Sequence, residues 1–414
     1  MQNRIRKGLV SMVRATLSRW RASTTRLRIV WALDATVGHV ASRTVRSSSN
    51  GGVIVLATAG MGNIGDEAML ESCLANAPGP VTIVIQRPES FSPSLNASRM
   101  VLPNLVDGPM LKRLPDVVRL VRRLKKASEF WVIGADVMDG VYYPPSAVSR
   151  FSLVATASRL GVRSRVLGFS WSEDAGPAAV EAIRRVAGST RLYVRDPISH
   201  RRLIELGVGQ AIAAADIVFA LPNPPSAPSQ GVPTSDGKLA LINVSGLIQG
   251  RMDQVPEFVD IVRHLNSNGW VIGVVPHVVR DGDDDLAAQA VLRSVIGSTQ
   301  GIWFLDEKPS VAEVQALVSQ ADLVITGRMH LAVLGIAAGV PAIILGTQGK
   351  VAGLCELVGR GATEVEPRPG FGREVIVESC NMESLGLDQV RSEVTSVRPK
   401  LEEMARRNFG GAAA

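Results

Sequence analysis

Short apolar runs recur along the first half of the chain, separated by longer stretches whose apolar positions repeat at helical spacing. The runs are rich in Val, Ile and Leu, as in strands that are buried on both faces of a sheet. We expect strands at VIVLA (53–57), VTIVIQ (81–86), FWVIG (130–134), SRVLGF (164–169) and RLYV (191–194). Helices are expected after Asp66, over 110–126, 145–160 and 176–188, and after Pro197. This alternation predicts βα units around a parallel sheet.

The same rhythm restarts in the second half. We expect strands over 239–244, 270–275, 302–305, 323–326 and 342–345, with helices over 254–267, 284–297, 310–320, 329–338 and 349–358. Residues 221–237 hold five prolines and no periodic pattern, which is typical of a linker. The fold class is therefore α/β, with two doubly wound Rossmann-like domains facing a cleft. The expected division is an extension (1–50), an N-terminal domain (51–221), a linker (222–237), a C-terminal domain (238–386) and a C-terminal helix with a tail (387–414).

The net charge of +7 belongs to the N-terminus. Residues 1–50 carry nine Arg, Lys7 and one acid, Asp34, which leaves the rest of the chain near −2 (7 − 9). This extension mixes Arg with Leu, Val and Trp. It has no uninterrupted apolar run of about 20 residues, the length that a membrane-spanning helix needs, so we expect that it does not span a bilayer. Two interpretations stay open: a basic amphipathic segment on an anionic membrane, or a disordered extension.

Composition excludes several classes of function. Basic residues of the body are not interleaved with aromatic residues, so we expect no nucleic-acid partner. The three cysteines are scattered, which indicates neither a metal site nor a disulfide framework and favours a reducing, cytoplasmic compartment. We expect no metal and no cofactor.

A glycine-rich turn, TAGMGNIGDEAML (58–70), follows the first strand. Gly62 and Gly65 let the backbone approach a ligand, and Asn63 lies between them. Asp66 could take a proton from a hydroxyl nucleophile, or it could simply cap the following helix. The spacing is not that of a nucleotide-binding fingerprint.

Arg328 and His330 follow the strand at 323–326. In a strand-to-helix turn both side chains can point to the same side, where the helix N-terminus adds amide donors. Arg recognises carboxylate and phosphate groups, and His carries a transferable proton near neutral pH. The turn therefore predicts a site for an anionic substrate.

Two further candidates follow other strands. Arg195 could contact an anion, or it could pair with its neighbour Asp196. His277 follows the strand at 270–275 and is a candidate substrate-binding residue. We interpret the acidic run behind it, RDGDDD (280–285), as a solvated helix start, because it lacks calcium-loop spacing.

The segments GNIGDEAML (62–70), VRDPISHRRLIELGV (194–208), VVPHVVRDGDDD (274–285) and ADLVITGRMHLAVLGIAAGVPAIIL (321–345), with Lys350 soon after, resemble the polysaccharide pyruvyl transferase family. The resemblance covers about residues 53–358. It implies a GT-B-like fold and transfer of the enolpyruvyl group of phosphoenolpyruvate to a sugar, often as a cyclic ketal, with release of phosphate. By this resemblance His330 would be the general acid, Arg328 would hold the donor's carboxylate or phosphate, and Arg195 would be a second anion contact. Lys350 is a further candidate for substrate binding.

The expected partners are phosphoenolpyruvate and a sugar or lipid-linked saccharide acceptor, with peripheral contact to the inner face of the plasma membrane through the basic N-terminus. Two stretches depart from the family pattern: IGADVMDG (133–140), where the family often has a run of glycines, and GFSWSEDAGP (168–177).

Two alternatives remain. A GT-B glycosyltransferase that uses a nucleotide sugar would favour a Glu seven residues before Pro341, where this chain has Leu334. The second alternative is a non-enzymatic scaffold of a polysaccharide assembly complex.

Overall fold

A computed structural model gives the fold and describes residues 24–43, 51–60, 62–93, 95–222, 237–346 and 349–410. Backbone contacts divide the chain into two compact units. Unit 1 contains the residues up to Thr58 together with Ala77–Pro88 and Asn96–Ala213. Unit 2 contains Ala59–Asn76, Glu89–Leu95 and the residues from Ala214 onward. The Pro-rich segment expected to be a linker lies almost wholly outside the described residues.

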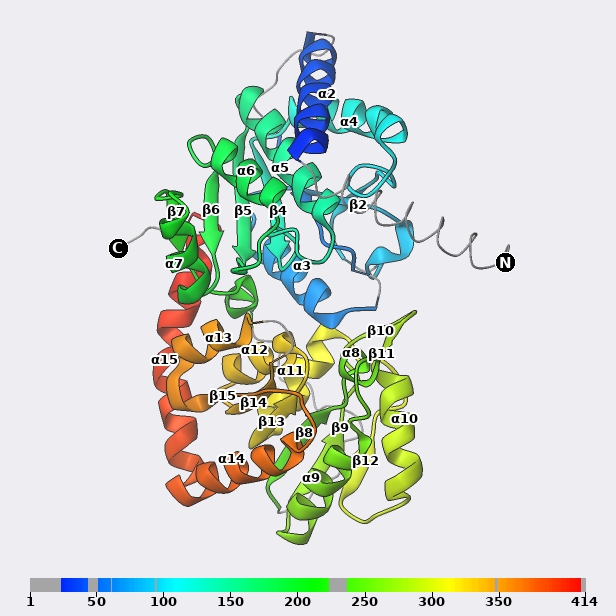
Figure 1. Cartoon of the computed structure of the whole chain (residues 1–414), viewed down its shortest axis with the longest axis vertical. Coiled ribbons are helices and arrows are strands. Elements are labelled where there is room, and N and C mark those ends of the chain that lie inside the picture. The colour runs from blue at the N-terminus through cyan, green and yellow to red at the C-terminus, as the bar shows by residue number, and fades with distance from the viewer. Residues whose placement is uncertain are drawn as a thin grey trace, which may run out of the picture. The chain divides into compact units, whose positions relative to one another are not determined.

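Unit 1 is built on a parallel sheet with the strand order β3-β2-β1-β4-β5-β6-β7 among the described residues (Figure 1). Its strands are β1 (Val53–Leu56), β2 (Val81–Ile85), β3 (Ser98–Val101), β4 (Glu129–Ala135), β5 (Arg163–Phe169), β6 (Arg191–Val194) and β7 (Ala211–Ala213). Its helices are α2 (Thr24–Arg43), α4 (Met110–Leu124), α5 (Pro144–Arg159), α6 (Pro177–Val186) and α7 (Pro197–Glu205), and η1 (Pro88–Ser90) is a short 3₁₀ turn at its border. The order reverses direction at β1, as in doubly wound folds.

The helix α2 lies in the stretch that the sequence analysis assigned to an extension. Its inner face carries Leu27, Val30 and Trp31, which are buried in the core of unit 1. Asp34 is fully buried on the same face, where it pairs with Arg113 of α4 and accepts a hydrogen bond of 2.6 Å from Ser152 Oγ of α5. The structure therefore makes α2 part of unit 1, because its apolar positions and one buried acid all find partners there.

Unit 2 is built on a second parallel sheet, with the order β12-β9-β8-β13-β14-β15 among the described residues. Its strands are β8 (Leu239–Asn243), β9 (Val271–Val274), β12 (Ile302–Phe304), β13 (Leu323–Thr326), β14 (Ala342–Leu345) and β15 (Ala362–Val365), and β10 (Val279–Arg280) with β11 (Asp283–Asp284) forms a small hairpin. Its helices are α3 (Ile64–Asn76), α8 (Gly246–Gln249), α9 (Val255–Ser267), α10 (Asp285–Ile296), α11 (Val311–Gln320), α12 (Met329–Ala337), α13 (Val351–Val358), α14 (Phe371–Leu385) and α15 (Leu387–Arg407), with the 3₁₀ turns η2 (Ile217–Ala220) and η3 (Gly359–Gly361).

The helix α3 follows β1 in the chain, yet its contacts lie in unit 2. Ser72 Oγ donates to the carbonyl of Ile217 at 2.5 Å, and Asn76 Nδ2 donates to the carbonyl of Ala220 at 3.0 Å, so α3 is fastened along η2. A domain boundary drawn at residue 221 therefore does not match the compact units. The glycine-rich turn and the second half of the chain belong to one body, which decides where the site lies.

The expected α/β class is confirmed, and so are the apolar strands, because fully buried parallel strands have a strong sequence signal. The strands β3, β7 and β15 and the helix α14 were not expected, since these strands are only partly buried and short. Among the described residues, none of the helices combines the length and apolar character needed to cross a bilayer.

Candidate active site

The backbone joins two of the motif segments in unit 2. The amide of Ile64 donates to the carbonyl of His277 at 3.1 Å, and the amide of Val279 donates to the carbonyl of Gly62 at 2.8 Å. Asn63 and Val278 form an antiparallel bridge between these bonds. Gly62 has a positive φ of 74°, and a Cβ there would lie 2.0 Å from the carbonyl oxygen of Val279, so only glycine fits. The two segments are thus one structural element, although 215 positions separate Gly62 from His277 (277 − 62).

The first turn of α3 lies directly against the ring of His330. Asn63 Oδ1 accepts a hydrogen bond of 3.0 Å from the amide of Gly65 and so caps the helix. A Cβ on Gly65 would lie 2.4 Å from Nδ1 of His330, so glycine at this position is what lets the ring lie there. The N-terminal end of α3, with the partial positive charge of the helix dipole, therefore faces the Nδ1 side of the imidazole.

The other ring nitrogen of His330 faces a carboxylate. Nε2 lies 3.5 Å from Oδ2 of Asp216, and the side chain of His330 is 14% exposed against 3% for Asp216. The second oxygen of Asp216 accepts a hydrogen bond of 3.1 Å from the amide of Val218 at the start of η2. The carboxylate is therefore held by the backbone within ion-pair distance of Nε2, although Nε2 forms no hydrogen bond among the described residues. A carboxylate beside an imidazole is an arrangement suited to a general acid or base.

Arg328 is buried and engaged by two carboxylates. Its Nη2 lies 2.6 Å from Oδ1 of Asp285 and also pairs with Asp283, whose other oxygen accepts from Nη1 at 3.1 Å. Burial would lower the pKa of Arg328, but the charge of Asp285 and the hydrogen bonds to both carboxylates outweigh it and raise the pKa. Burial also opposes ionisation of Asp283, yet Arg328 and Arg280 hold the pKa of Asp283 below its ordinary value. Both shifts favour the ionised forms of Arg328 and Asp283.

The acidic run was expected to be a solvated helix start, and for two of its members this is wrong. Asp285 is fully buried and Asp283 is 9% exposed, because Arg328 compensates their charges. Two members behave as expected: Asp281 is exposed, and the carboxylate of Asp284 accepts from the amides of Leu286 and Ala287 and caps α10.

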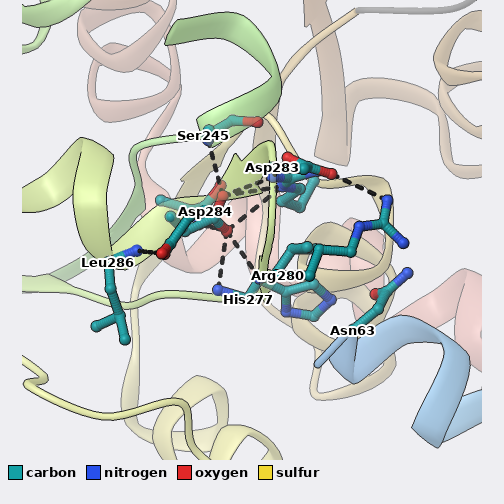
Figure 2. A network of polar contacts seen from close by, with 12 residues as sticks. Asn63, Ser245, His277, Arg280, Asp283, Asp284 and Leu286 are labelled. Carbon is teal, nitrogen blue, oxygen red and sulfur yellow. Dashed lines mark hydrogen bonds and ion pairs between the residues drawn. The ribbon is translucent and has the colours of Figure 1, made fainter. Parts of the chain in front are cut away.

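Asp285 also organises the backbone around it (Figure 2). One oxygen accepts from the amides of His277 and Val278 and the other from the amide of Gly246, all at 2.8–2.9 Å. Figure 2 shows these contacts converging on one carboxylate, with Asn63 at the border of the network toward α3. Asp285 thus joins the turns that follow β8 and β9, and its ion pair with Arg328 adds the turn that follows β13.

His277 is buried beside these charges. Its side chain is 1% exposed, and neither ring nitrogen has a hydrogen-bond partner among the described residues. Burial first, and then the neighbouring His330, Arg328 and Lys308, hold the pKa of His277 well below its ordinary value. The ring is therefore neutral, and its predicted contact with substrate stays a prediction.

Lys308 brings a further cation to the same region. Its Nζ lies 3.2 Å from both carboxylate oxygens of Glu67 in the first turn of α3. One turn further along α3, burial and the charge of Glu67 raise the pKa of Glu71, opposed by Lys308. Arg328, Lys308 and the two histidines therefore occupy one neighbourhood of unit 2.

Asp66 is 7% exposed, and its Oδ2 accepts a hydrogen bond of 3.2 Å from the amide of Gly60. Asn63, not Asp66, caps α3, so the capping interpretation of Asp66 is wrong. Its carboxylate instead closes the glycine-rich turn on itself, one residue away from the Gly65–His330 contact.

Arg195 belongs to unit 1, where its Nε donates to Ser170 Oγ at 2.7 Å and Ser170 Oγ donates to Asp196 at 3.0 Å. Ser170 lies in one of the two stretches that depart from the family pattern, and its amide donates to the carbonyl of Ala135 in the other. Ala135 has a positive φ of 47°, a conformation that usually favours glycine. The anion contact predicted for Arg195 stays a prediction.

Lys350 lies at the N-cap position of α13, after β14, and is half-buried. Its predicted contact with substrate also stays a prediction.

Sequence reasoning missed Asp216 and Lys308. Asp216 follows β7 and Lys308 follows β12, so the rule that singled out Arg328, a polar residue just beyond a strand, applies to both. Asp216 was overlooked because β7 has only three residues and lies in an Ala-rich stretch without a clear strand pattern.

Among the described residues, no three or more His, Cys, Asp or Glu side chains are grouped so as to hold a metal ion. The expected independence from metals stays a prediction.

A family model described as polysaccharide pyruvyl transferase matches residues 63–349. The match begins at Asn63, includes the His330–Asp216 pair and the Arg328 cluster, and ends at Gly349. No curated protein matches the chain.

Three solved structures show the same fold at low sequence identity. UDP-GlcNAc 2-epimerase from Neisseria meningitidis bound to UDP-GlcNAc is 11% identical over 86% of this chain and 97% of that one, with a TM-score of 0.59. A glycosyltransferase from Rickettsia africae ESF-5 is 10% identical over 88% and 100%, with a TM-score of 0.52. Sucrose-phosphate synthase from Thermosynechococcus elongatus is 10% identical over 86% and 94%, with a TM-score of 0.54. These likenesses establish the fold alone: two Rossmann-like units of the GT-B-like class.

Proposed function

The chain belongs to the polysaccharide pyruvyl transferase family, and from this premise we propose the reaction that it performs. We propose that it moves the enolpyruvyl group of phosphoenolpyruvate onto a sugar of a cell-surface polysaccharide or of its lipid-linked precursor. The product is a pyruvate ketal, and phosphate is released.

The observation that carries this proposal is the setting of His330. The carboxylate of Asp216 lies 3.5 Å from Nε2, and Nδ1 faces the N-terminal turn of α3 across Gly65. An imidazole placed in this way can deliver a proton from Nδ1 beside a helix end that favours a bound anion.

The proposed chemistry starts at the donor double bond. His330 protonates the methylene carbon of phosphoenolpyruvate, and the adjacent carbon becomes an oxocarbenium-like centre. A sugar hydroxyl adds to that carbon and loses its proton, the bond to the phosphate oxygen breaks, and a second hydroxyl closes the ketal. The two sugar hydroxyls together lose two hydrogens. The new methyl group gains one hydrogen, and the phosphate that leaves gains the other. General acid catalysis of this kind contributes roughly 10²–10⁴ in rate.

For the base we keep Asp66, because it follows Gly65 and so lies next to the His330 contact in α3. For the donor's anionic groups we assign Arg328 and Lys308. Both cations already pair with carboxylates of unit 2, so the donor competes with Asp283 or Glu67 for them. This competition favours a donor with close to three negative charges over a weakly charged one.

A glycosyltransferase that uses a nucleotide sugar is the second candidate, because the GT-B-like neighbours include a glycosyltransferase. It ranks lower because Leu334, at the position where such an enzyme would use an acid for the ribose, is apolar and 2% exposed in α12.

The test is incubation of the purified chain with phosphoenolpyruvate and a panel of candidate glycans, followed by mass spectrometry. A glycan that gains one pyruvate less one water, together with released phosphate, supports the proposal. His330→Gln is the matched control and should give neither product. Thermal shift separates the candidates before the acceptor is known, because only the true donor stabilises the folded chain. Stabilisation by a nucleotide sugar and not by phosphoenolpyruvate would overturn the proposal.

A further inference from the structure

The outer face of α4 in unit 1 carries a continuous row of cations. At helical spacing, the exposed positions of α4 and the residues just after it are Leu111, Lys112, Pro115, Arg119, Arg122, Arg123 and Lys126. The opposite face is apolar and packs into the core of unit 1 through Val117, Leu120, Val121 and Leu124. The single acid of the helix, Asp116, is buried. The row, which we call the α4 face, therefore presents five positive charges and no exposed carboxylate of its own helix.

Most of these cations are not neutralised within unit 1. Arg119 lies 3.6 Å from Asp116, and Arg123 donates to Thr82 Oγ1 at 2.9 Å. Lys112, Arg122 and Lys126 form no ion pair with the residues that the structure describes. An uncompensated row on one helix face attracts a polyanion and holds it by charge.

Neighbouring parts of the chain add to the same charge. The helix α2 packs against α4 and exposes Arg43, whereas its exposed Arg28 lies 3.5 Å from Glu181 of α6. The 23 residues before α2 contain six Lys and Arg and no acid. The sequence before α2 and the exposed face of α4 are thus both basic.

Apolar exposure on the α4 face distinguishes between the possible polyanions. Leu111 is 79% exposed, the largest exposure among the large apolar side chains that the structure describes, and Val40 of α2 is 60% exposed. The helix α4 has no aromatic residue on which bases could stack. Cations interleaved with exposed aliphatic side chains are typical of helices that lie at an anionic bilayer surface.

We propose that the α4 face is a membrane-docking surface that binds anionic lipid headgroups, with Leu111 entering the interface. The docking surface consists of residues 111–126 of unit 1, outside the extension (1–50) that the sequence analysis singled out. It is independent of the proposed reaction, because none of its residues belongs to unit 2.

The test is co-sedimentation of the full chain with vesicles of phosphatidylcholine alone or with added phosphatidylglycerol. The docking variant is Lys112→Gln, Arg119→Gln, Arg122→Gln and Lys126→Gln combined. Its matched control removes the same number of exposed charges from unit 2: Arg263→Gln, Arg373→Gln, Lys400→Gln and Arg406→Gln. We expect the wild type and the control to bind anionic vesicles alike and to release them as salt rises. The docking variant should bind anionic vesicles at least about tenfold more weakly than the wild type.

Three results would overturn the proposal. One is no preference of the wild type for anionic vesicles, and another is equal binding by the docking and control variants. The third is loss of single-stranded nucleic-acid binding in the docking variant while vesicle binding stays intact, which would assign the α4 face to a nucleic acid. Release of phosphate in solution should be the same in all variants, so failure of docking and failure of the proposed reaction are distinguishable.

Discussion

Oδ2 of Asp216 lies 3.5 Å from Nε2 of His330, and this contact links η2 to the first turn of α12. Oδ1 of the same carboxylate is held at 3.1 Å by the amide of Val218. Asp216 therefore places a negative charge beside Nε2 of His330, while Nδ1 lies against Gly65 of α3. We predict that Asp216 is a positioning residue for the ring. The pair was invisible to motif reasoning because 114 positions separate the two residues (330 − 216).

We expect Asp216→Asn to lower kcat by about 10–100-fold with little change in KM, because Asn keeps the hydrogen bond to Val218 but not the negative charge. Steady-state phosphate release measures both constants, with the acceptor that the mass-spectrometry test identifies. Asp306→Asn removes an exposed acid of unit 2 and is the matched control. An unchanged kcat in Asp216→Asn would show that the carboxylate does not serve His330.

Gly65→Ala should lower kcat/KM by about 10²-fold, because the new Cβ would lie 2.4 Å from Nδ1 of His330 and the ring must move. Gly79→Ala is the matched control, since a Cβ there meets nothing within 4 Å. Circular dichroism and thermal unfolding check that both variants fold. Full activity in Gly65→Ala would mean that the ring position is not used.

Arg328→Ala should destabilise the folded chain by about 3–5 kcal/mol, because it leaves Asp285 as a buried charge without its cation and Asp283 with Arg280 alone. Arg280→Ala removes only an ion pair of the partly exposed Arg280 with Asp283 and should cost about 1 kcal/mol or less. Urea unfolding at neutral pH gives both values. Equal, small effects would show that the Arg328 cluster contributes nothing beyond a surface pair.

The strands that position the site could be predicted from sequence, because β1, β9 and β13 are short apolar runs with polar turns behind them. The same reasoning placed Arg328 and His330 together at the end of β13. It could not reveal that Arg328 is already paired, since the partners lie more than forty positions away in a run that looks solvated.

The position of α3 could not be predicted for a similar reason. Chain order places it with β1, but its side chains bond to η2 and its first turn pairs with the segment after β9. Local propensity predicts that α3 is a helix. Only tertiary contacts determine which unit it joins.

A chain that starts at residue 44 should be strongly destabilised relative to a chain that starts at residue 24. The shorter chain lacks α2, which buries Leu27, Val30 and Trp31, each worth about 1.5–3 kcal/mol. It also leaves Arg113 buried without Asp34. Asp34→Ala tests that pair alone and should cost about 3–5 kcal/mol, against 1 kcal/mol or less for the exposed Arg28→Ala. Equal stability of both truncated chains would contradict the placement of α2 in unit 1.

Stability should fall as pH drops below about 6.5, because His277 is neutral and buried in the folded chain but can take a proton once unfolded. Burial and the nearby His330, Arg328 and Lys308 lower the pKa of His277 in the folded state. Between the unfolded and the lowered pKa the unfolded state binds the extra proton, so the free energy of unfolding decreases by up to about 1.4 kcal/mol per pH unit.

His277→Phe removes this titration and breaks no hydrogen bond of the ring, since neither nitrogen has a partner among the described residues. Urea unfolding is measured at pH 7.5, 6.5 and 5.5, which are about one unit above, at and one unit below the ordinary pKa of histidine. The free energy of unfolding should therefore change less steeply with pH in His277→Phe than in the wild type. His264→Gln controls for the loss of a histidine on the outside of unit 2. Parallel slopes in the wild type and His277→Phe would mean that the imidazole at 277 titrates alike in the folded and unfolded chain, and that the charges around it do not hold it neutral.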